Sequence, residues 1–152
     1  MEPKEPAKQR IFIDADVLFA GAASPNEHSA SNLILRMAEL TLIEVITSTQ
    51  VITEAERNLL EKLPKALPAF QLLVSRSLKI VEDPAPAELD AYAGLANPVY
   101  LPIFVAAIRE GCGHLATFNV HHYQPGHLSV TIIKLGDLIL RIRYLLARMS
   151  DA

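Results

Sequence analysis

The sequence predicts an α/β domain in which helices cover both faces of a central parallel sheet. Short β-branched and apolar runs alternate along the chain with segments whose apolar residues recur at helical spacing. Parallel neighbours need a connection of about a dozen residues or more, and most of the intervening segments are that long. Hydrophobic residues make up 51% of the 152 residues and charged residues 20%, which is typical of a packed globular protein. We therefore expect a three-layer α/β/α architecture.

Five short apolar segments are predicted to form the strands of this sheet. They are rich in Ile, Val, Leu and Phe, and turn-forming residues flank them. The predicted strands are 10–14, 42–47, 78–81, 114–118 and 129–134. After the first strand, Gly21, Ser24 and Pro25 predict a loop.

The predicted helices follow from the spacing of apolar residues and from capping signals. Ser48 lies where an N-cap belongs, ahead of a helix that carries Val51 and Leu59 on one face. Pro102 fits the first turn of a helix that runs to residue 110, where Gly111 ends it. The remaining helices are predicted at 28–40, around 70–74, at 88–95 and at 135–149.

Length and composition predict one domain and exclude several classes of protein. We expect residues 1–9 to form a solvated, flexible leader and residues 10–149 to form a single domain. Asp14 and Asp16 interrupt the first apolar run, which excludes a signal peptide, and the run ending at Arg109 is too short for a membrane span. Cys112 is the only cysteine, so no internal disulfide forms, which suits a cytoplasmic protein. The net charge of −3 gives no broad basic face for duplex DNA.

Acidic and amide side chains follow the predicted strands and the second helix. Asp14 ends the first strand, Asp16 follows it, Glu54 lies one turn into the helix after Ser48, and Asn119 follows the strand 114–118. In parallel sheets the functional crevice lies beyond the carboxyl ends of the strands, so we expect these side chains to matter most. A purely structural reading also exists, in which Asp14 caps the loop or helix that follows it.

The order of these segments resembles the PIN-domain family of metal-dependent ribonucleases. The resemblance is based on four segments, which are Ile11-Phe12-Ile13-Asp14-Ala15-Asp16-Val17-Leu18, the helix with Glu54, the segment 101–108 and the segment 114–119. Asp14 and Glu54 match the first two acids of that family. The resemblance implies a PIN-like α/β/α fold and a site in which carboxylates hold Mg²⁺ or Mn²⁺, whose bound water attacks an RNA phosphodiester. It also implies an antitoxin protein as a partner, because small members of the family are often toxins of toxin–antitoxin pairs.

Two of the four acids of the family are replaced in this chain. Tyr100 stands where the family usually has Asp before the Ala-rich helix, and Asn119 stands where a Thr-Gly-Asp motif usually ends. Asp16 stands where the family commonly has Asn, which returns one negative charge near Asp14. On the resemblance, we expect Asp14, Asp16, Glu54 and Asn119 to be catalytic. Asp14, Glu54 and Asn119 are the expected metal ligands.

Three functions are compatible with these residues. The first is a Mg²⁺- or Mn²⁺-dependent endoribonuclease of the toxin type, and the second is a PIN-like module that binds RNA or protein without cutting. A receiver-like signalling domain ranks last, because the expected downstream Lys is missing. His114, His121, His122 and His127 also form a candidate cluster for a transition metal, and Cys112 is expected to be a small turn residue. The apolar stripe from Leu138 to Leu146 predicts a two-fold homodimer.

Overall fold

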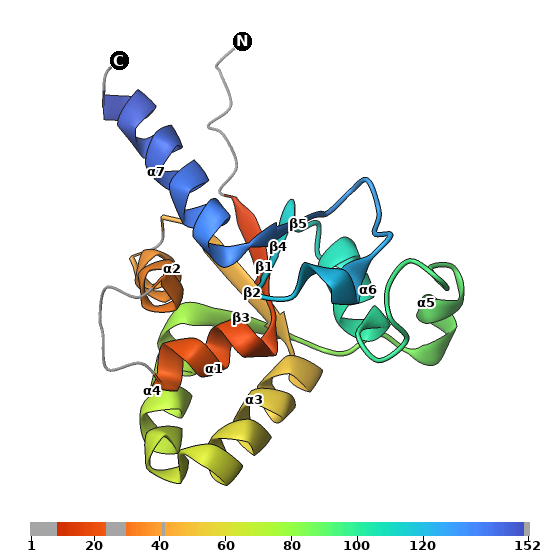
Figure 1. Cartoon of the computed structure of the whole chain (residues 1–152), viewed down its shortest axis with the longest axis horizontal. Coiled ribbons are helices and arrows are strands. Elements are labelled where there is room, and N and C mark those ends of the chain that lie inside the picture. Colours follow the sequence, from red (N-terminus) through yellow and green to blue (C-terminus); the bar gives the residue numbers. More distant parts are fainter. Residues whose placement is uncertain (1–8, 24–29, 41, 151–152) are drawn as a thin grey trace.

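The computed structural model describes residues 9–23, 30–40 and 42–150. The predicted leader, 1–9, lies outside the described residues except for Gln9. Within the described part, five parallel strands form one sheet in the order β3-β2-β1-β4-β5 (Figure 1). The strands are β1 (Arg10–Ile13), β2 (Glu44–Ser48), β3 (Leu78–Val81), β4 (His114–Thr117) and β5 (Thr131–Lys134). The predicted α/β class with a parallel sheet is confirmed.

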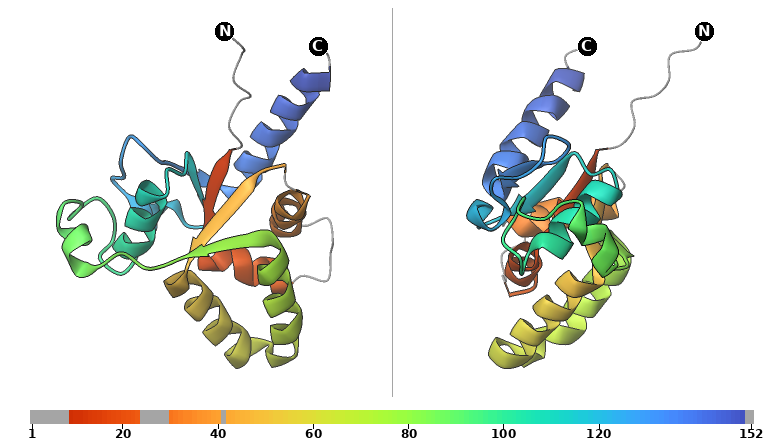
Figure 2. Two further views of the ribbon diagram at one scale, coloured as in Figure 1. Left: turned by 180° about the vertical axis from the view of Figure 1, so that it is seen from behind. Right: turned by 90° about the vertical axis from the view of Figure 1, so that its right-hand side faces the viewer.

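Helices pack on both faces of the sheet. They are α1 (Ala15–Ala23), α2 (Ala30–Glu39), α3 (Thr49–Lys62), α4 (Leu67–Ser77), α5 (Pro86–Asp90), α6 (Leu101–Arg109) and α7 (Leu135–Ser150), with short 3-10 turns η1 (Pro64–Ala66) and η2 (Val120–Tyr123). Helix α6 lies against one face, whereas α1, α2 and α7 lie on the other (Figures 1 and 2). This arrangement gives the predicted three layers.

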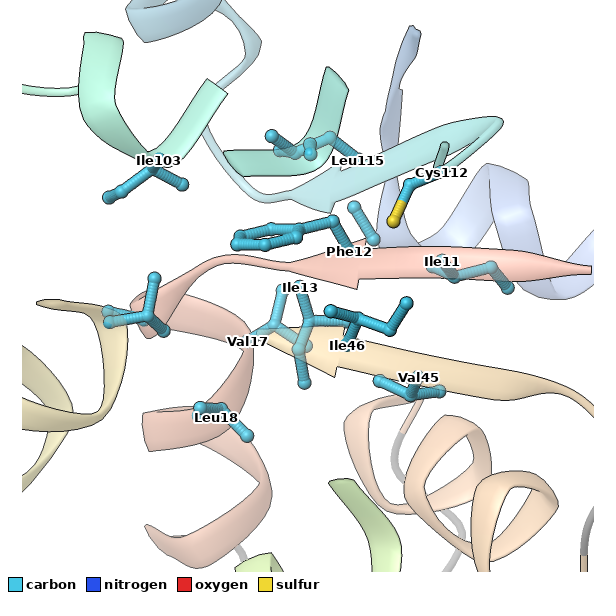
Figure 3. Packing of buried hydrophobic residues seen from close by; sticks show 14 of the residues in the cluster. Ile11, Phe12, Ile13, Val17, Leu18, Val45, Ile46, Ile103, Cys112 and Leu115 are labelled. Atoms are coloured by element: carbon cyan, nitrogen blue, oxygen red, sulfur yellow. The ribbon is translucent and has the colours of Figure 1, made fainter. Parts of the chain in front are cut away.

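The alternation of side chains along β1 builds a core on each face of the sheet. Phe12 points from β1 toward Ile103 of α6, whereas Ile13 points to the opposite side, toward Val17 and Leu18 of α1 (Figure 3). All five of these side chains are fully or almost fully buried. A buried strand with apolar residues on both faces is the expected signature of a parallel sheet. The core therefore fixes β1, and with it the residue that follows β1, from two sides.

Helix α1 is a correction to the sequence-based prediction, which placed a loop after β1. The sequence predicts Gly21 in that loop, but Gly21 lies inside the helix, where a Cβ atom would come within 3.0 Å of Leu35 Cδ1 of α2. The glycine therefore allows α1 and α2 to pack closely. Sequence patterning also gave no signal, because α1 is apolar on nearly all sides and lacks an amphipathic period.

Capping residues set the other helix boundaries largely as predicted. Ser48 is the N-cap of α3, and its side chain accepts a hydrogen bond from the Val51 amide at 3.4 Å. Helix α6 ends before Gly111, which has a positive φ of 67°. Helix α5 differs from the predicted 88–95, because Pro86 begins it and the chain turns after Asp90, with Gly94 at φ 85°.

The apolar stripe of α7 faces the core of the same chain. Leu138 and Ile142 are buried, whereas Leu140 and Tyr144 are exposed. The side chain of Leu146 lies outside the described residues. The first half of the stripe thus packs within the protomer, whereas Leu145 is exposed. The homodimer stays a prediction. In the described part of the chain no helix is long and apolar enough to cross a membrane.

Candidate acidic site

The predicted acids lie where the strand order of the sheet reverses. From β1 the chain moves outward through β2 to β3, and it then returns to the other side of β1 to form β4 and β5. Asp14 directly follows β1, Asn119 follows β4 by two positions, and α3 begins immediately after β2. The carboxyl ends of these strands meet at the same edge of the sheet, which is where ligands bind in doubly wound folds.

Asp14 is buried, and its carboxylate is held by three hydrogen bonds. Its Oδ1 accepts from the Ala15 amide at 2.7 Å, and its Oδ2 accepts from Thr117 Oγ1 at 3.0 Å and from the Tyr123 hydroxyl at 2.8 Å. Burial and the nearby Asp14 charge raise the pKa of Tyr123, so its hydroxyl remains a donor. The bond to Ala15 at the start of α1 agrees with the capping interpretation. The two hydroxyls hold the carboxylate in one orientation.

Asp16 shares a donor with Asp14 and has one unsatisfied oxygen. Its Oδ2 accepts from Thr117 Oγ1 at 3.2 Å and from the Phe118 amide at 3.1 Å. Its Oδ1 is buried and makes no hydrogen bond of normal geometry among the described residues, although the Val17 amide lies near enough to lower the pKa of this carboxyl. Burial, together with the nearby Asp14 charge, raises the pKa of Asp16 from its ordinary value of 3.8 to about 6. A buried anionic oxygen without a donor is costly, and a cation would relieve that cost.

Glu54 reaches the same acidic edge from α3. Burial and the charge of Asp14 raise the pKa of Glu54, whereas Arg57 and His122 lower it. A charge on Asp14 can act on Glu54 in this way only if the two carboxylates lie near each other. The structure thus brings Asp14, Asp16 and Glu54, which are far apart in sequence, into one electrostatic neighbourhood.

Asn119 and Tyr100 are both joined to His122. Asn119 Oδ1 accepts from the His121 amide at 3.2 Å, and its Nδ2 donates to His122 Nε2 at 2.9 Å. The rings of Tyr100 and His122 are stacked, with centroids 3.9 Å apart and planes inclined by 9°. Burial and then the charges of Glu54 and the two aspartates raise the pKa of Tyr100. Tyr100 therefore lies beside the acids, as its place in the PIN-like pattern predicts.

The side chains present fit a Mg²⁺ or Mn²⁺ site that is rich in water. In the described part of the chain, no three Asp, Glu, His or Cys side chains come close enough to form a cage around a metal ion. Mg²⁺, however, is usually held by one or two carboxylates and keeps several water molecules. The unpaired Oδ1 of Asp16 and the raised pKa values of Asp16 and Glu54 are the features that a divalent cation would relieve.

Thr117 and Tyr123 are site residues that sequence reasoning missed. Both donate to Asp14, although each lies more than a hundred positions away in sequence. The available signals were a threonine at the end of a buried strand and a tyrosine directly after the His121-His122 pair, and neither pattern is specific.

The histidine cluster predicted from the sequence does not form. His114 begins β4, whereas His121 and His122 follow its other end, and His127 contacts Tyr92 and Ser129 instead. Cys112 is buried, and burial raises its pKa to about 12, so the thiol stays protonated. This agrees with its predicted role as a small turn residue.

The raised pKa of Asp16 predicts how stability depends on pH in the absence of metal. Between about pH 4 and pH 6 the folded protein binds more protons at Asp16 than the unfolded chain does, so the contribution of Asp16 to stability falls as pH rises through this window. We expect Asp16→Asn to flatten the decline in melting temperature over that range. Thermal unfolding in chelator, with Asp137→Asn on α7 as the control, measures the effect. A decline that is equally steep in both variants would contradict the assigned pKa.

The fold and the acidic edge together define a PIN-like α/β domain. No protein-family model and no curated protein matches the sequence. Solved structures do match the fold, and three of them illustrate the likeness. PAE2754 from Pyrobaculum aerophilum matches with a TM-score of 0.64 and 19% identity, and covers 90% of each chain.

Two further structures that match are VapBC2 and VapC20. VapBC2 from Rickettsia felis, solved with a DNA fragment of its promoter, matches with a TM-score of 0.60 and 16% identity over 83% of this chain and 98% of that chain. VapC20 from Mycobacterium tuberculosis, a toxin that cleaves the sarcin–ricin loop, matches with a TM-score of 0.58 and 18% identity over 79% and 98%. The resemblance to the PIN-domain family that the sequence predicted is thus confirmed for the fold.

Proposed function

We propose that this protein is a Mg²⁺- or Mn²⁺-dependent endoribonuclease of the VapC toxin type. The observation that supports it most is the juxtaposition of Asp14, Asp16 and Glu54 at the switch point of the sheet, where the charge of Asp14 disfavours the charged forms of Asp16 and Glu54. The fold shared with VapC20, a toxin that cleaves RNA, supports the same activity. A buried carboxylate that raises the pKa of two others at such an edge is an arrangement that a divalent cation would stabilise.

In this proposal each residue has a distinct role. One or two of Asp14, Asp16 and Glu54 would bind the ion directly and the rest through its water molecules. Asn119 would add a neutral oxygen through the lone pair that its bond to His121 leaves free. Once bound, the ion supplies an activated water molecule and neutralises charge on the phosphate.

The chain's own residues prepare the site and can move a proton. Thr117 and Tyr123 fix the orientation of the Asp14 carboxylate, so that it does not have to reorganise when RNA binds. Glu54, with its raised pKa, is suited to accept a proton from the attacking water.

A second candidate function is a PIN-like module that binds RNA or a protein without cutting. The stacked pair of Tyr100 and His122 favours it, because two rings occupy the space where the resemblance places a third carboxylate. An aromatic pair beside a polar edge is suited to stacking on an RNA base.

We also propose an antitoxin protein as a partner. The support is the fold shared with VapBC2, which was solved as a toxin–antitoxin pair. A two-fold homodimer remains a prediction from the sequence.

The test of the ribonuclease proposal is RNA cleavage by the purified protein with Mg²⁺, with Mn²⁺ and with excess chelator. We expect cleavage in either ion and none in chelator, and we expect calorimetry to show binding of the same ions. Cleavage that survives excess chelator would rule out the metal-dependent mechanism. RNA binding without cleavage under every condition would favour the second candidate.

A further inference from the structure

A polar groove runs from the acidic site along α3. Its volume is about 540 Å³, and its walls are formed by α3, Asp83 and Val99. The α3 residues that line it have the spacing of one helical face, and they are Gln50, Thr53, Glu54, Arg57 and Asn58. The opposite face of α3 carries the buried residues Val51, Ala55 and Leu59. The groove therefore extends about one helical turn to either side of Glu54.

Two hydrogen bonds of Gln50 join the walls of the groove. The Gln50 amide donates to Asp83 Oδ1 at 2.8 Å, and its side-chain Nε2 donates to the Val99 carbonyl at 3.3 Å. Asp83 follows β3, and Val99 precedes Tyr100 and α6, so both segments are anchored to the start of α3. The bond from Gln50 also occupies one oxygen of Asp83.

The remaining polar side chains of the groove are available to a ligand. Within the residues that the structure describes, the side chains of Thr53, Arg57 and Asn58 make no hydrogen bond or ion pair with protein. By contrast, Arg10 is paired with Glu44, and Arg109 with Glu88. Arg57 is the one positive side chain among the residues that line the groove. Its charge acts on Glu54, so it lies close enough to the acidic site to serve the same strand of RNA.

We propose that this groove holds the nucleotide next to the cleaved phosphate of single-stranded RNA. Arg57 pairs with the phosphate of that nucleotide, and Asn58 and Thr53 hydrogen-bond to its sugar or base. The volume suits one nucleotide, since sites for small ligands commonly measure about 300 to 1,000 Å³. The inference rests on the proposed action on RNA, and it adds a subsite with a side chain for sequence preference.

The test is a binding measurement that does not depend on cleavage. Fluorescence anisotropy with short oligouridylate and oligoadenylate is measured in Ca²⁺ at one fixed pH, and gel analysis afterwards checks that the RNA is intact. We expect Arg57→Gln to weaken binding about tenfold, because a charged hydrogen bond is lost. The slope of log affinity against log salt should fall by about 0.7, the value for one phosphate contact on a single strand. Arg76→Gln, an equal change on the exposed face of α4, should alter neither.

A second variant tests the base or sugar contact. Asn58→Leu keeps the size of the side chain but removes its donors and acceptor, and we expect it to change the ratio of the two affinities while leaving the salt slope unchanged. Equal binding by the Arg57 and Arg76 variants would overturn the subsite, as would a wild type that binds neither RNA. If the Arg57 effect appears but the protein never cleaves RNA, the subsite stands and the ribonuclease proposal fails. If metal-dependent cleavage is observed but Arg57→Gln does not weaken binding, the ribonuclease proposal stands and the subsite fails.

Discussion

Asp14→Asn is expected to slow divalent-ion-dependent cleavage of RNA by about 100-fold or more, while the protein remains folded. Asp14 is the buried acid at the switch point, and its charge raises the pKa of both Asp16 and Glu54. The substitution preserves the shape of the side chain but removes the charge that would hold the ion. The same variant should bind Mg²⁺ more weakly in calorimetry.

The hydrogen bonds of Asp14 indicate why this variant should still fold. The amide oxygen of the new side chain can face the Ala15 amide, which has only a hydrogen to offer. Its NH₂ group then faces the hydroxyls of Thr117 and Tyr123, and each hydroxyl can rotate to accept. Removal of one negative charge also reduces the repulsion on Asp16. The loss of activity should therefore come without a large fall in melting temperature.

A matched control distinguishes the effect of losing a charge at the site from the effect of losing a charge elsewhere on the protein. Asp137→Asn makes the same substitution at an exposed position in the first turn of α7, and it should leave cleavage and ion binding unchanged. Undiminished cleavage by Asp14→Asn would refute the role of this acid. A variant that has lost its cooperative unfolding would require Glu54→Gln, on the half-buried α3 position, as the substitute test.

The sequence predicted the parts of the site that depend on strand ends. A buried apolar strand that stops at an acid, and a helix that begins after Ser48, both follow from local periodicity and capping. Parallel pairing then places Asp14, Asn119 and the start of α3 at one edge, whatever the details of packing. For this reason the topology and the neighbourhood of the acids could be predicted without coordinates.

The contacts around those acids could not be predicted in the same way. Tyr123 reaches Asp14 across more than a hundred residues. Tyr100 stacks on His122 because the segment before α6 meets η2, where the Asn97 amide donates to the His122 carbonyl. The groove beside α3 depends on the bonds from Gln50 to two other segments. Such contacts arise from tertiary packing, and no periodic pattern in a single segment encodes them. Helix α1 could not be predicted for the same reason, because the glycine inside it, Gly21, is explained only by the close approach of Leu35.

The double variant Tyr100→Asp with Asn119→Asp is expected to raise the rate of Mg²⁺-dependent cleavage about tenfold or more. This corresponds to stabilising the transition state by about 1.4 kcal/mol or more. Tyr100 lies near Glu54, Asp14 and Asp16, whose charges raise its pKa, so a carboxylate at this position would face the same ion. The variant also loses the stack on His122 and the amide bond to that ring. A carboxylate at position 119 can instead accept from a hydrogen on His122 Nε2.

The same substitutions should lower the stability of the metal-free protein and increase the stabilisation that Mg²⁺ provides. Five nearby carboxylates repel one another, so we expect the double variant to melt at a lower temperature than the wild type in chelator and to gain more from Mg²⁺. Tyr100→Asn in the wild-type background is the control, because it removes the ring and adds no charge. If the control and the double variant respond alike to Mg²⁺, a shortage of ligands is not what limits this site. If neither the wild type nor the double variant cleaves RNA, and Tyr100→Asn binds RNA more weakly than the wild type, the stacked Tyr100 and His122 belong to a binding surface.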